Sequence, residues 1–219
     1  MEIEKSFYSV VVVLIIVLVI SVGATIPAKS DGFVYGDPPD YSKSIIIEAF
    51  FDPICPDSRA SWPPLKQALH YYSSSSSSVS LILHPFALPY HDNSFVACRA
   101  LHIVNKLNAS ATYPMLELFF QHQEKFYNQP TRDMSRTSVI DHIVMLAEKA
   151  VGNSLLSAVE SGFSDRQTDL ATRVSFKYGC SRGVYGTPFF FVNGFLLPDA
   201  GDAIDYKGWK SIIDPLIAD

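Results

Sequence analysis

A single cysteine stands where an apolar segment of this sequence gives way to a helix-like segment. The stretch FFDPICPDSRASWPPL covers residues 50–65 and places Cys55 directly before Pro56. A proline in the first turn of a helix loses no hydrogen bond, so Pro56 favours a helix that begins here. Free N–H groups and the helix dipole at such an N-terminus favour the thiolate form of a cysteine. Cys55 is therefore the candidate nucleophile.

A serine occupies the position where a second thiol would be useful. Ser58 stands three residues after Cys55, the spacing at which a redox protein carries its resolving cysteine. With one thiol the site can attack a disulfide and form a mixed disulfide, but it cannot release itself. Release requires an outside thiol, such as the substrate's second cysteine or glutathione. Net dithiol oxidation by this site alone is excluded, while Ser58 can donate a hydrogen bond to the thiolate.

The elements around Cys55 are predicted to form a βαβ unit. Residues 45–51 are β-branched and aromatic, which is typical of a strand buried on both faces. A helix is expected over about residues 56–72, kinked at Pro63 and Pro64. Residues 79–83 predict a second strand, parallel to the first because a helix connects them.

The middle of the chain is predicted to be helical, and its far end returns to strands. Helices are expected over about residues 92–107, from Pro114, over 138–151 and over 164–179. After them come a strand, an Asn-Gly hairpin turn, a returning strand and a last helix, at residues 189–192, 193–194, 195–197 and 206–216. The pattern predicts an α/β frame with a helical insertion at about residues 92–178.

This order, β-α-β, helical insertion, β-β-α, is that of a thioredoxin fold, and two motifs make the resemblance specific. FFDPICPDS resembles the active-site entry of the DsbA-like subgroup of the thioredoxin-like superfamily, whose motif is C-P-x-C. GVYGTPFFFVNG, residues 183–194, resembles the subgroup's second signature, a Gly-Thr-Pro with a cis proline before a strand and an Asn-Gly turn. The resemblance covers about residues 44–216 and is closest to a secreted, plant-type member with a CxxS site.

The resemblance implies where the site residues lie. Pro188 is expected to form a cis peptide bond and to lie against Cys55, and the backbone of Thr187 is expected to pair with an extended substrate chain. Pro56 and Asp57, which follow the cysteine, are expected to contact the substrate as well.

Two further departures from the family pattern weaken the expected catalysis. Asp57 places a negative charge two residues after Cys55, which opposes the thiolate, although it also suits the helix dipole. The family's buried carboxylate lies six residues before the cysteine, and Ala49 occupies that position here. Glu48 is one residue further back, and on a regular strand it points to the opposite face.

The three cysteines leave at least one thiol unpaired. Cys98 falls on a predicted helix and is expected to be a buried, inert thiol. Cys180 is expected in the loop that leads into residues 184–188, a loop that approaches the active site in the family. Three arrangements stay open: a structural Cys98–Cys180 bridge that leaves Cys55 free, which is favoured; a Cys55–Cys180 redox pair; and no bridge.

The N-terminal sequence indicates a targeting segment. Residues 10–20 are an unbroken apolar run, and SVGA follows, so residues 1–24 predict a signal peptide cleaved after Ala24. The alternative is an uncleaved anchor over residues 7–26, the only case in which a membrane is a partner. Residues 25–43 are expected to be an extended lead-in to the domain.

Entry into the secretory pathway follows from either interpretation, so the expected location is the endomembrane lumen or the exterior. The sequon at Asn108 is then a glycosylation candidate. The net charge of −5 gives no basic surface for nucleic acid. The histidines show no metal-ligand spacing, so neither a metal nor a resident cofactor is expected, and glutathione enters only as an external thiol.

Two functional classes fit these residues, and the sequence leaves open whether the protein is an enzyme. The favoured class is a secreted monothiol oxidoreductase or isomerase that acts on protein or small-molecule disulfides through Cys55. The alternative is a non-catalytic thioredoxin-fold module that binds extended peptides beside Pro188. A glutathione-dependent transferase, like the kappa class with its similar helical insertion, is a third interpretation.

Overall fold

A computed structural model describes residues 29–73, 79–198 and 201–217 of the chain. The described residues from Asp31 onward belong to one compact unit. The predicted signal peptide, residues 1–24, and the first part of the predicted lead-in lie outside the described residues. The compact unit begins at Asp31 rather than near Ser44, because residues of the lead-in join the sheet.

The centre of the fold is a five-stranded mixed sheet with the order β1-β3-β2-β4-β5. Its strands are β1 Phe33–Tyr35, β2 Ile45–Phe51, β3 Val79–Pro85, β4 Phe189–Val192 and β5 Phe195–Leu196. β2 and β3 are parallel, as predicted, and the other neighbours are antiparallel. β1 was not predicted, since its three residues are too few to show a period.

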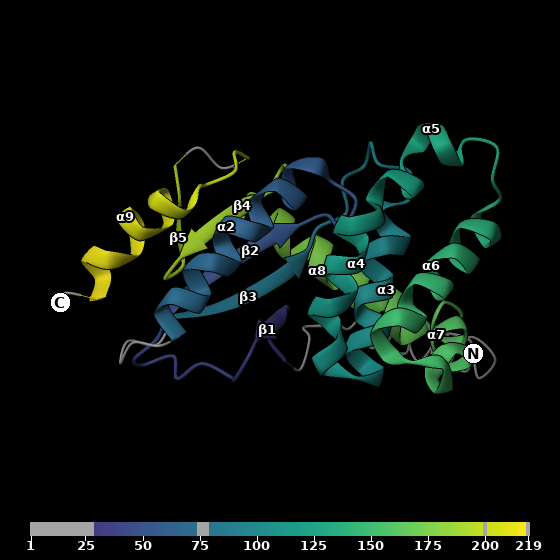
Figure 1. The fold of residues 1–219 in the computed structure, drawn as a ribbon, viewed down its shortest axis with the longest axis horizontal. Helices are drawn as coiled ribbons and strands as arrows, with labels where there is room; N and C mark the ends of the chain where they lie inside the picture. The colour runs from purple at the N-terminus through teal and green to yellow at the C-terminus, as the bar shows by residue number, and fades with distance from the viewer. Residues whose placement is uncertain (1–28, 74–78, 199–200, 218–219) are drawn as a thin grey trace, which may run out of the picture. The chain divides into compact units, whose positions relative to one another are not determined.

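The helices follow the predicted order. They are α2 Pro56–Ser73, α3 Ser94–Leu107, α4 Thr112–His122, α5 Asn128–Thr131, α6 Arg136–Val151, α7 Leu156–Gly162, α8 Arg166–Ser181 and α9 Tyr206–Ile217. The short α5 and α7 were not predicted. Asp165 caps α8, and its carboxylate accepts a hydrogen bond from the Gln167 amide at 2.8 Å. Figure 1 shows α3, α4, α6 and α7 gathered beside the sheet as the predicted insertion.

Alternation along β2 explains why helices cover both faces of the sheet. Ile47, Ala49 and Phe51 join the main core, to which α2 and α9 contribute Leu65 and Trp209. The intervening residue Phe50 packs in a second cluster with Phe189 and Phe191 of β4 and Phe176 of α8. Both faces of the central strand are therefore buried, which accounts for its continuous apolar sequence.

The register of β2 decides where Glu48 points. β2 and β3 pair without a bulge from Ile45 and Val79 to Phe51 and Pro85. Ala49 consequently faces the α2 side, and the predicted orientation of Glu48 to the opposite side is confirmed. Because Ala49 occupies it, the position of the family's buried carboxylate carries no charged side chain in this chain.

Glu48 instead belongs to a buried polar cluster on the α8 side. Its carboxylate accepts hydrogen bonds from the Tyr178 hydroxyl at 2.8 Å and from Arg182 at 3.2 Å. His84 Nε2 lies 3.5 Å from Glu48 Oε1, and His84 Nδ1 lies 2.8 Å from Asp31 Oδ2. Burial raises the pKa of Glu48, but its hydrogen bonds and the Arg182 charge outweigh burial and lower it.

His102 lies at the edge of this cluster in its neutral form. Its Nε2 is 3.0 Å from Ser175 Oγ, which also donates to Asp31 Oδ1 at 2.6 Å. A hydroxyl has one proton, so His102 Nε2–H donates to Ser175. Burial lowers the pKa of His102 to about 4, against the opposing charge of Asp31.

His102→Gln is expected to make the protein less sensitive to acid. The folded-state pKa of about 4 lies below the usual value of 6.5, so the unfolded chain takes up this proton first as the pH falls. The wild type therefore loses stability progressively below about pH 6.5, by about 2 kcal/mol near pH 4 after allowance for solvent screening. Glutamine keeps a donor for Ser175 but does not titrate. Urea unfolding of both proteins at about pH 6.5 and pH 4 checks this prediction. An equal change in the free energy of unfolding between the two pH values in wild type and variant would contradict it.

Candidate active site around Cys55

Cys55 lies in the loop that joins β2 to α2, at the start of the helix. Its amide donates to the Asp52 carbonyl at 3.0 Å, and its own carbonyl accepts from the Arg59 amide in the first turn of α2. The side chain is buried, with 3% of its surface exposed. The sequence motif therefore produces the predicted helix N-terminus, with the sulfur at its tip.

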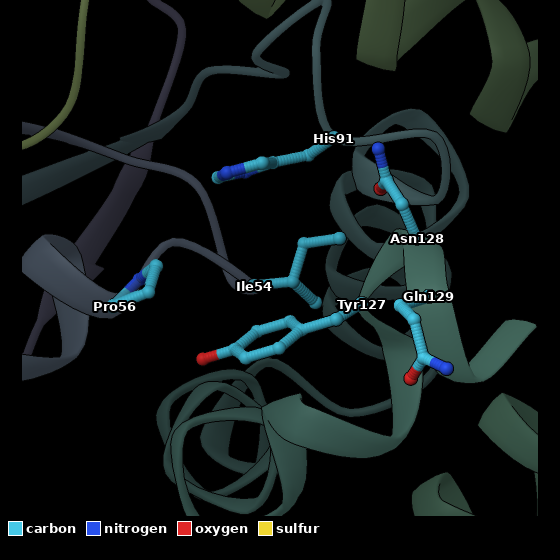
Figure 2. A pocket seen from close by; sticks show the side chains of 6 residues that line it. All are labelled: Ile54, Pro56, His91, Tyr127, Asn128 and Gln129. Carbon is cyan, nitrogen blue, oxygen red and sulfur yellow. The ribbon is translucent and has the colours of Figure 1, made fainter.

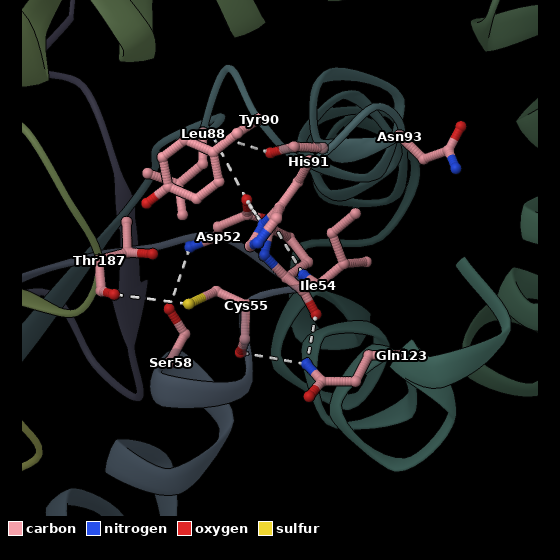
Figure 3. Close-up of polar contacts among 12 residues, drawn as sticks. Asp52, Ile54, Cys55, Ser58, Leu88, Tyr90, His91, Asn93, Gln123 and Thr187 are labelled. Atoms are coloured by element: carbon pink, nitrogen blue, oxygen red, sulfur yellow. Dashed lines mark hydrogen bonds and ion pairs between the residues drawn. The ribbon is translucent and has the colours of Figure 1, made fainter. Parts of the chain in front are cut away.

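The loop before β4 lies against this cysteine. The Thr187–Pro188 peptide bond is cis, as the motif predicts. Cys55 Sγ donates a hydrogen bond to the Thr187 carbonyl at 3.4 Å, across 132 positions of sequence (Figure 3). Cys55 and Thr187 are therefore in contact, as expected, and this contact depends on β2 and β4 being neighbours in the sheet.

Ser58 is fully buried one turn into α2, close to the cysteine. Its Oγ accepts a hydrogen bond from the Asp52 amide at 3.3 Å. A hydrogen bond between Ser58 and Cys55 is not present among the described residues. Because Ser58 Oγ acts as an acceptor toward Asp52, its proton stays available for donation to a Cys55 thiolate. Pro56 and Asp57, by contrast, are both exposed beside the cysteine, as a substrate-contacting role requires.

Asp52 is a buried carboxylate that the sequence analysis missed. Its Oδ1 accepts from the Ile54 amide at 2.9 Å, and its Oδ2 accepts from the Leu88 amide at 3.3 Å. Oδ2 also lies 2.9 Å from His91 Nδ1. The only signal was an aspartate between an apolar strand and the cysteine, and the sequence does not reveal that residues 88 and 91 fold over it.

Asp52→Ala is expected to lower the free energy of unfolding by about 3 kcal/mol, because it leaves the buried Ile54 amide without an acceptor and removes the partner of the His91 ring. The Leu88 amide keeps the Ser94 hydroxyl as its acceptor, at 3.1 Å. Urea denaturation measures the change. The matched control is Asp57→Ala in the same segment, where the carboxylate is exposed. Loss of its favourable interaction with the helix dipole should cost about 0.5 kcal/mol. Similar losses in the two variants would show that the Asp52 contacts add no stability.

The helical insertion holds the cysteine loop from the other side. Gln123 Nε2 donates to the carbonyl of Cys55 at 3.1 Å and to that of Pro53 at 3.4 Å. Its Oε1 accepts from the Tyr127 hydroxyl at 2.9 Å. These residues, which follow α4, were read only as part of a helical region, yet they fix the backbone that carries the thiol.

The cis-proline loop presents a buried hydroxyl and an exposed ring. Thr187 is 6% exposed, and its Oγ1 has no hydrogen-bond partner among the described residues. Figure 3 shows this hydroxyl on the side of the loop that faces Cys55. Tyr185, two residues earlier, is 76% exposed. The residue whose carbonyl contacts the thiol thus also carries an unpaired hydroxyl.

Tyr90 borders the thiol from the segment between β3 and α3. Its ring is mostly exposed and contacts the His91 ring edge to face. Partial burial and then the negative charges of a Cys55 thiolate and Asp52 raise the pKa of Tyr90. Tyr90 is thus within electrostatic range of the thiol and remains neutral at physiological pH.

A small pocket adjoins the cysteine loop (Figure 2). Its volume is about 300 Å³, and its lining residues are Ile54, Pro56, His91, Tyr127, Asn128 and Gln129. Ile54 and Pro56 are the immediate neighbours of Cys55 in the sequence. The remaining residues come from the segment before α3 and from the start of α5 in the insertion, so the pocket forms only in the folded chain.

The favoured Cys98–Cys180 bridge and the alternative Cys55–Cys180 pair are both wrong for this structure, where all three cysteines are free. Cys98 is fully buried in α3. Cys180 is exposed in the last turn of α8 and not in a loop, because the helix continues to Ser181. Burial raises the pKa of the Cys98 thiol well above its usual value, in line with the predicted inert role.

Three further features of the described residues bear on glycosylation, membrane insertion and metal binding. Asn108 is exposed after α3, and its side-chain oxygen accepts from the Ser110 amide at 3.1 Å. Within residues 29–73, 79–198 and 201–217, no helix has the length and apolar character needed to span a bilayer. Within the same ranges, His, Cys, Asp and Glu side chains do not gather in groups of three or more suited to a metal ion.

The arrangement of sheet, flanking helices, helix-tip cysteine and cis-proline loop is that of the thioredoxin class. The sequence matches the family described as thioredoxin over residues 30–215, and the chain belongs to this family. The predicted α/β thioredoxin fold is thereby confirmed. No curated protein matches the chain.

Solved structures with the same fold include several thiol-disulfide proteins. A thioredoxin-like oxidoreductase from Silicibacter pomeroyi DSS-3 aligns with a TM-score of 0.65 and 14% identity, covering 87% of this chain and 95% of that one. The thiol-disulfide exchange protein alpha-DsbA2 from Wolbachia pipientis gives 0.64 and 17%, covering 84% and 87%. A periplasmic thioredoxin-like protein from Salmonella enterica serovar Typhimurium gives 0.61 and 16%, covering 86% and 91%. The predicted likeness to DsbA-like proteins is thus found at the level of the fold.

Proposed function

We propose that this protein is a monothiol thiol-disulfide exchange protein that acts on disulfides through Cys55. The observation that supports this most directly is the 3.4 Å contact between Cys55 Sγ and the Thr187 carbonyl, at the tip of α2. It places the thiol beside the edge of a loop whose backbone can pair with an extended chain. The unpaired Thr187 hydroxyl offers such a chain a further hydrogen bond.

The proposed reaction is disulfide exchange by a site that has a single thiol. The Cys55 thiolate attacks one sulfur of a substrate disulfide, a new S–S bond forms, and the substrate's other sulfur leaves as a thiolate. No electrons are gained or lost overall. Because Ser58 cannot attack the mixed disulfide, a second thiol must do so, either from glutathione or from another cysteine of the substrate. The second route exchanges disulfide partners within the substrate and is therefore an isomerase reaction.

The proposed location is the secretory pathway. The N-terminal apolar run supports it, and the oxidising conditions there supply disulfides. Asn108 is exposed, which is consistent with glycosylation of its sequon. A periplasmic relative of the same fold, from Salmonella, occupies the equivalent oxidising compartment in a bacterium.

A second candidate function is peptide binding without turnover. The low exposure of Cys55, 3%, and the highly exposed ring of Tyr185 favour it. In that case the loop before β4 would hold an extended peptide, and the thiol would serve only as a buried apolar group.

Mapping adducts with oxidised glutathione tests the proposed function. The purified protein is incubated with the disulfide, quenched with acid, digested and analysed by mass spectrometry. We expect a glutathione adduct at Cys55 that persists until a reduced thiol is added. Because Cys180 is exposed, an adduct is expected there as well. Its rate of formation gives the reactivity of an ordinary surface thiol for comparison. Modification of Cys180 without modification of Cys55 would favour the binding module.

A further inference from the structure

The pocket beside Cys55 has walls that are already fixed by hydrogen bonds. His91 is held by the buried carboxylate of Asp52 at 2.9 Å. Tyr127 is held through its hydroxyl, which donates to Gln123 at 2.9 Å. Asn128 accepts from the Asp92 amide and donates to the Tyr90 carbonyl, both at 2.9 Å. Little ordering entropy remains to be lost when an occupant enters.

The lining selects an uncharged occupant of limited size. None of the six lining residues is Asp, Glu, Lys or Arg, and Ile54, Pro56 and Tyr127 supply mostly apolar surface. Pockets that enclose whole small ligands range from about 300 to 1,000 Å³. At about 300 Å³ this pocket is at the lower limit, a size that suits one large side chain.

The geometry of the walls favours an aromatic occupant. Figure 2 shows the His91 ring on one side of the pocket and the Tyr127 ring on the other, with Ile54 between them. A ring that enters the pocket can pack against one of these aromatic surfaces and against Ile54, and an aromatic pair adds about 0.5–1.5 kcal/mol beyond the area that it buries. Branched aliphatic side chains would gain free energy from burial in the pocket but not from an aromatic pair.

The position of the pocket indicates that the side chain belongs to a polypeptide. Ile54 and Pro56 flank Cys55 directly, so a side chain in the pocket lies against the loop that carries the reactive sulfur. Glutathione has no large apolar side chain with which to fill the pocket. The exposed ring of Tyr90, packed on His91, extends the apolar surface outwards for neighbouring substrate residues.

We propose that the pocket formed by Ile54, Pro56, His91, Tyr127, Asn128 and Gln129 is a subsite for an aromatic side chain adjacent to the cysteine of a polypeptide substrate. The proposal rests on the proposed function of Cys55 in disulfide exchange. It names the substrate class: proteins with an exposed aromatic residue next to a cysteine.

A set of activated peptides measures the preference. Short peptides Gly-Cys-Xaa, with Xaa as Phe, Leu or Ser, carry their cysteine as a mixed disulfide with thionitrobenzoate. The Cys55 thiolate attacks the peptide sulfur, the peptide–Cys55 S–S bond forms, and coloured thionitrobenzoate leaves with the electron pair. Burial of the aromatic ring should make the Phe peptide react roughly tenfold or more faster than the Ser peptide at limiting concentration. A Cys180→Ser background removes the signal of the exposed thiol.

Variants assign the preference to the pocket. Gln129→Trp fills the pocket from an exposed position, so the Phe-to-Ser rate ratio should fall close to one. The matched control is Gln67→Trp, the same change at an exposed position of α2 outside the pocket, which should leave the ratio unchanged. Tyr127→Ala removes one ring wall and should also lower the ratio. Unfolding would expose Cys55 and Cys98 as ordinary thiols and would also bring the ratio to one, so the ratio is compared only for variants whose circular dichroism matches that of the wild type.

The outcomes separate the two proposals. Equal rates for the Phe and Ser peptides would overturn the subsite while leaving exchange at Cys55 in place. If no peptide forms an adduct, the proposed function fails, and equilibrium binding of the unactivated peptides to the Cys55→Ser variant decides on the pocket. Tighter binding of the Phe peptide, abolished by Gln129→Trp, would then support the subsite, and equal binding would overturn it.

Discussion

Ser58→Cys is expected to turn a protein that stops at the mixed disulfide into one that oxidises dithiols. Ser58 lies one turn into α2 from Cys55, and residues three apart on a helix bring their side chains together. That spacing permits a disulfide. Attack on the mixed disulfide would become intramolecular, which should accelerate release by about a hundredfold or more. Oxidation of a reduced dithiol peptide, with oxidised glutathione as the electron acceptor, measures the gain in turnover.

The matched control for this variant is Ser61→Cys. Ser61 is another fully buried serine of α2, and its hydroxyl donates to the Asp57 carbonyl at 2.8 Å. It lies almost a full turn beyond Ser58, so its thiol should not reach Cys55 and turnover should stay at the wild-type level. Equal rates for Ser58→Cys and the wild type, with both proteins folded, would show that the remaining site no longer supports exchange.

Cys55→Ala is expected to abolish mixed-disulfide formation with activated peptides at the proposed site. The reason is chemical, since no other described thiol contacts the cis-proline loop: Cys98 is fully buried in α3, and Cys180 is exposed on α8. The expected rate is that of a surface thiol alone. Release of thionitrobenzoate, followed over time, gives the fast and slow components in the wild type and only the slow component in Cys55→Ala.

Cys180→Ser supplies the complementary control. It should remove the slow component and keep the fast one, because its side chain lies outside the site. The double variant should release no thionitrobenzoate while folded. A fast component that persists in Cys55→Ala, or that disappears in Cys180→Ser, would show that the reactive sulfur belongs to another residue. Either result would contradict the proposed function.

Local patterns were sufficient for most of the fold. The β-branched run that became β2, the proline at the start of α2 and the Asn-Gly turn all act through short-range preferences. In the structure Asn193 and Gly194 have positive φ values of 49° and 82°, the conformation that this turn requires. Where no periodic pattern existed, as in the three residues of β1 and the four of α5, the elements were missed.

The cysteine pairing shows a limit of inference by resemblance. Counting sulfur atoms cannot show which of them approach each other, because bridge geometry depends on the positions of two Cα atoms in space. Burial of Cys98 and exposure of Cys180 are properties of how α3 and α8 pack, and they leave both thiols unpaired.

From the sequence alone came the thiol, its helix, the serine that replaces its partner and the second loop with its proline, since each is written in a few consecutive residues. Tertiary structure alone supplied the surroundings: the Asp52–His91 pair, the Gln123 clamp on the cysteine loop and the pocket walled by His91 and Tyr127. These groups are separated by tens of positions and meet only when the insertion packs against the sheet. Burial and hydrogen bonding are pairwise properties in space, so no single stretch of residues encodes them.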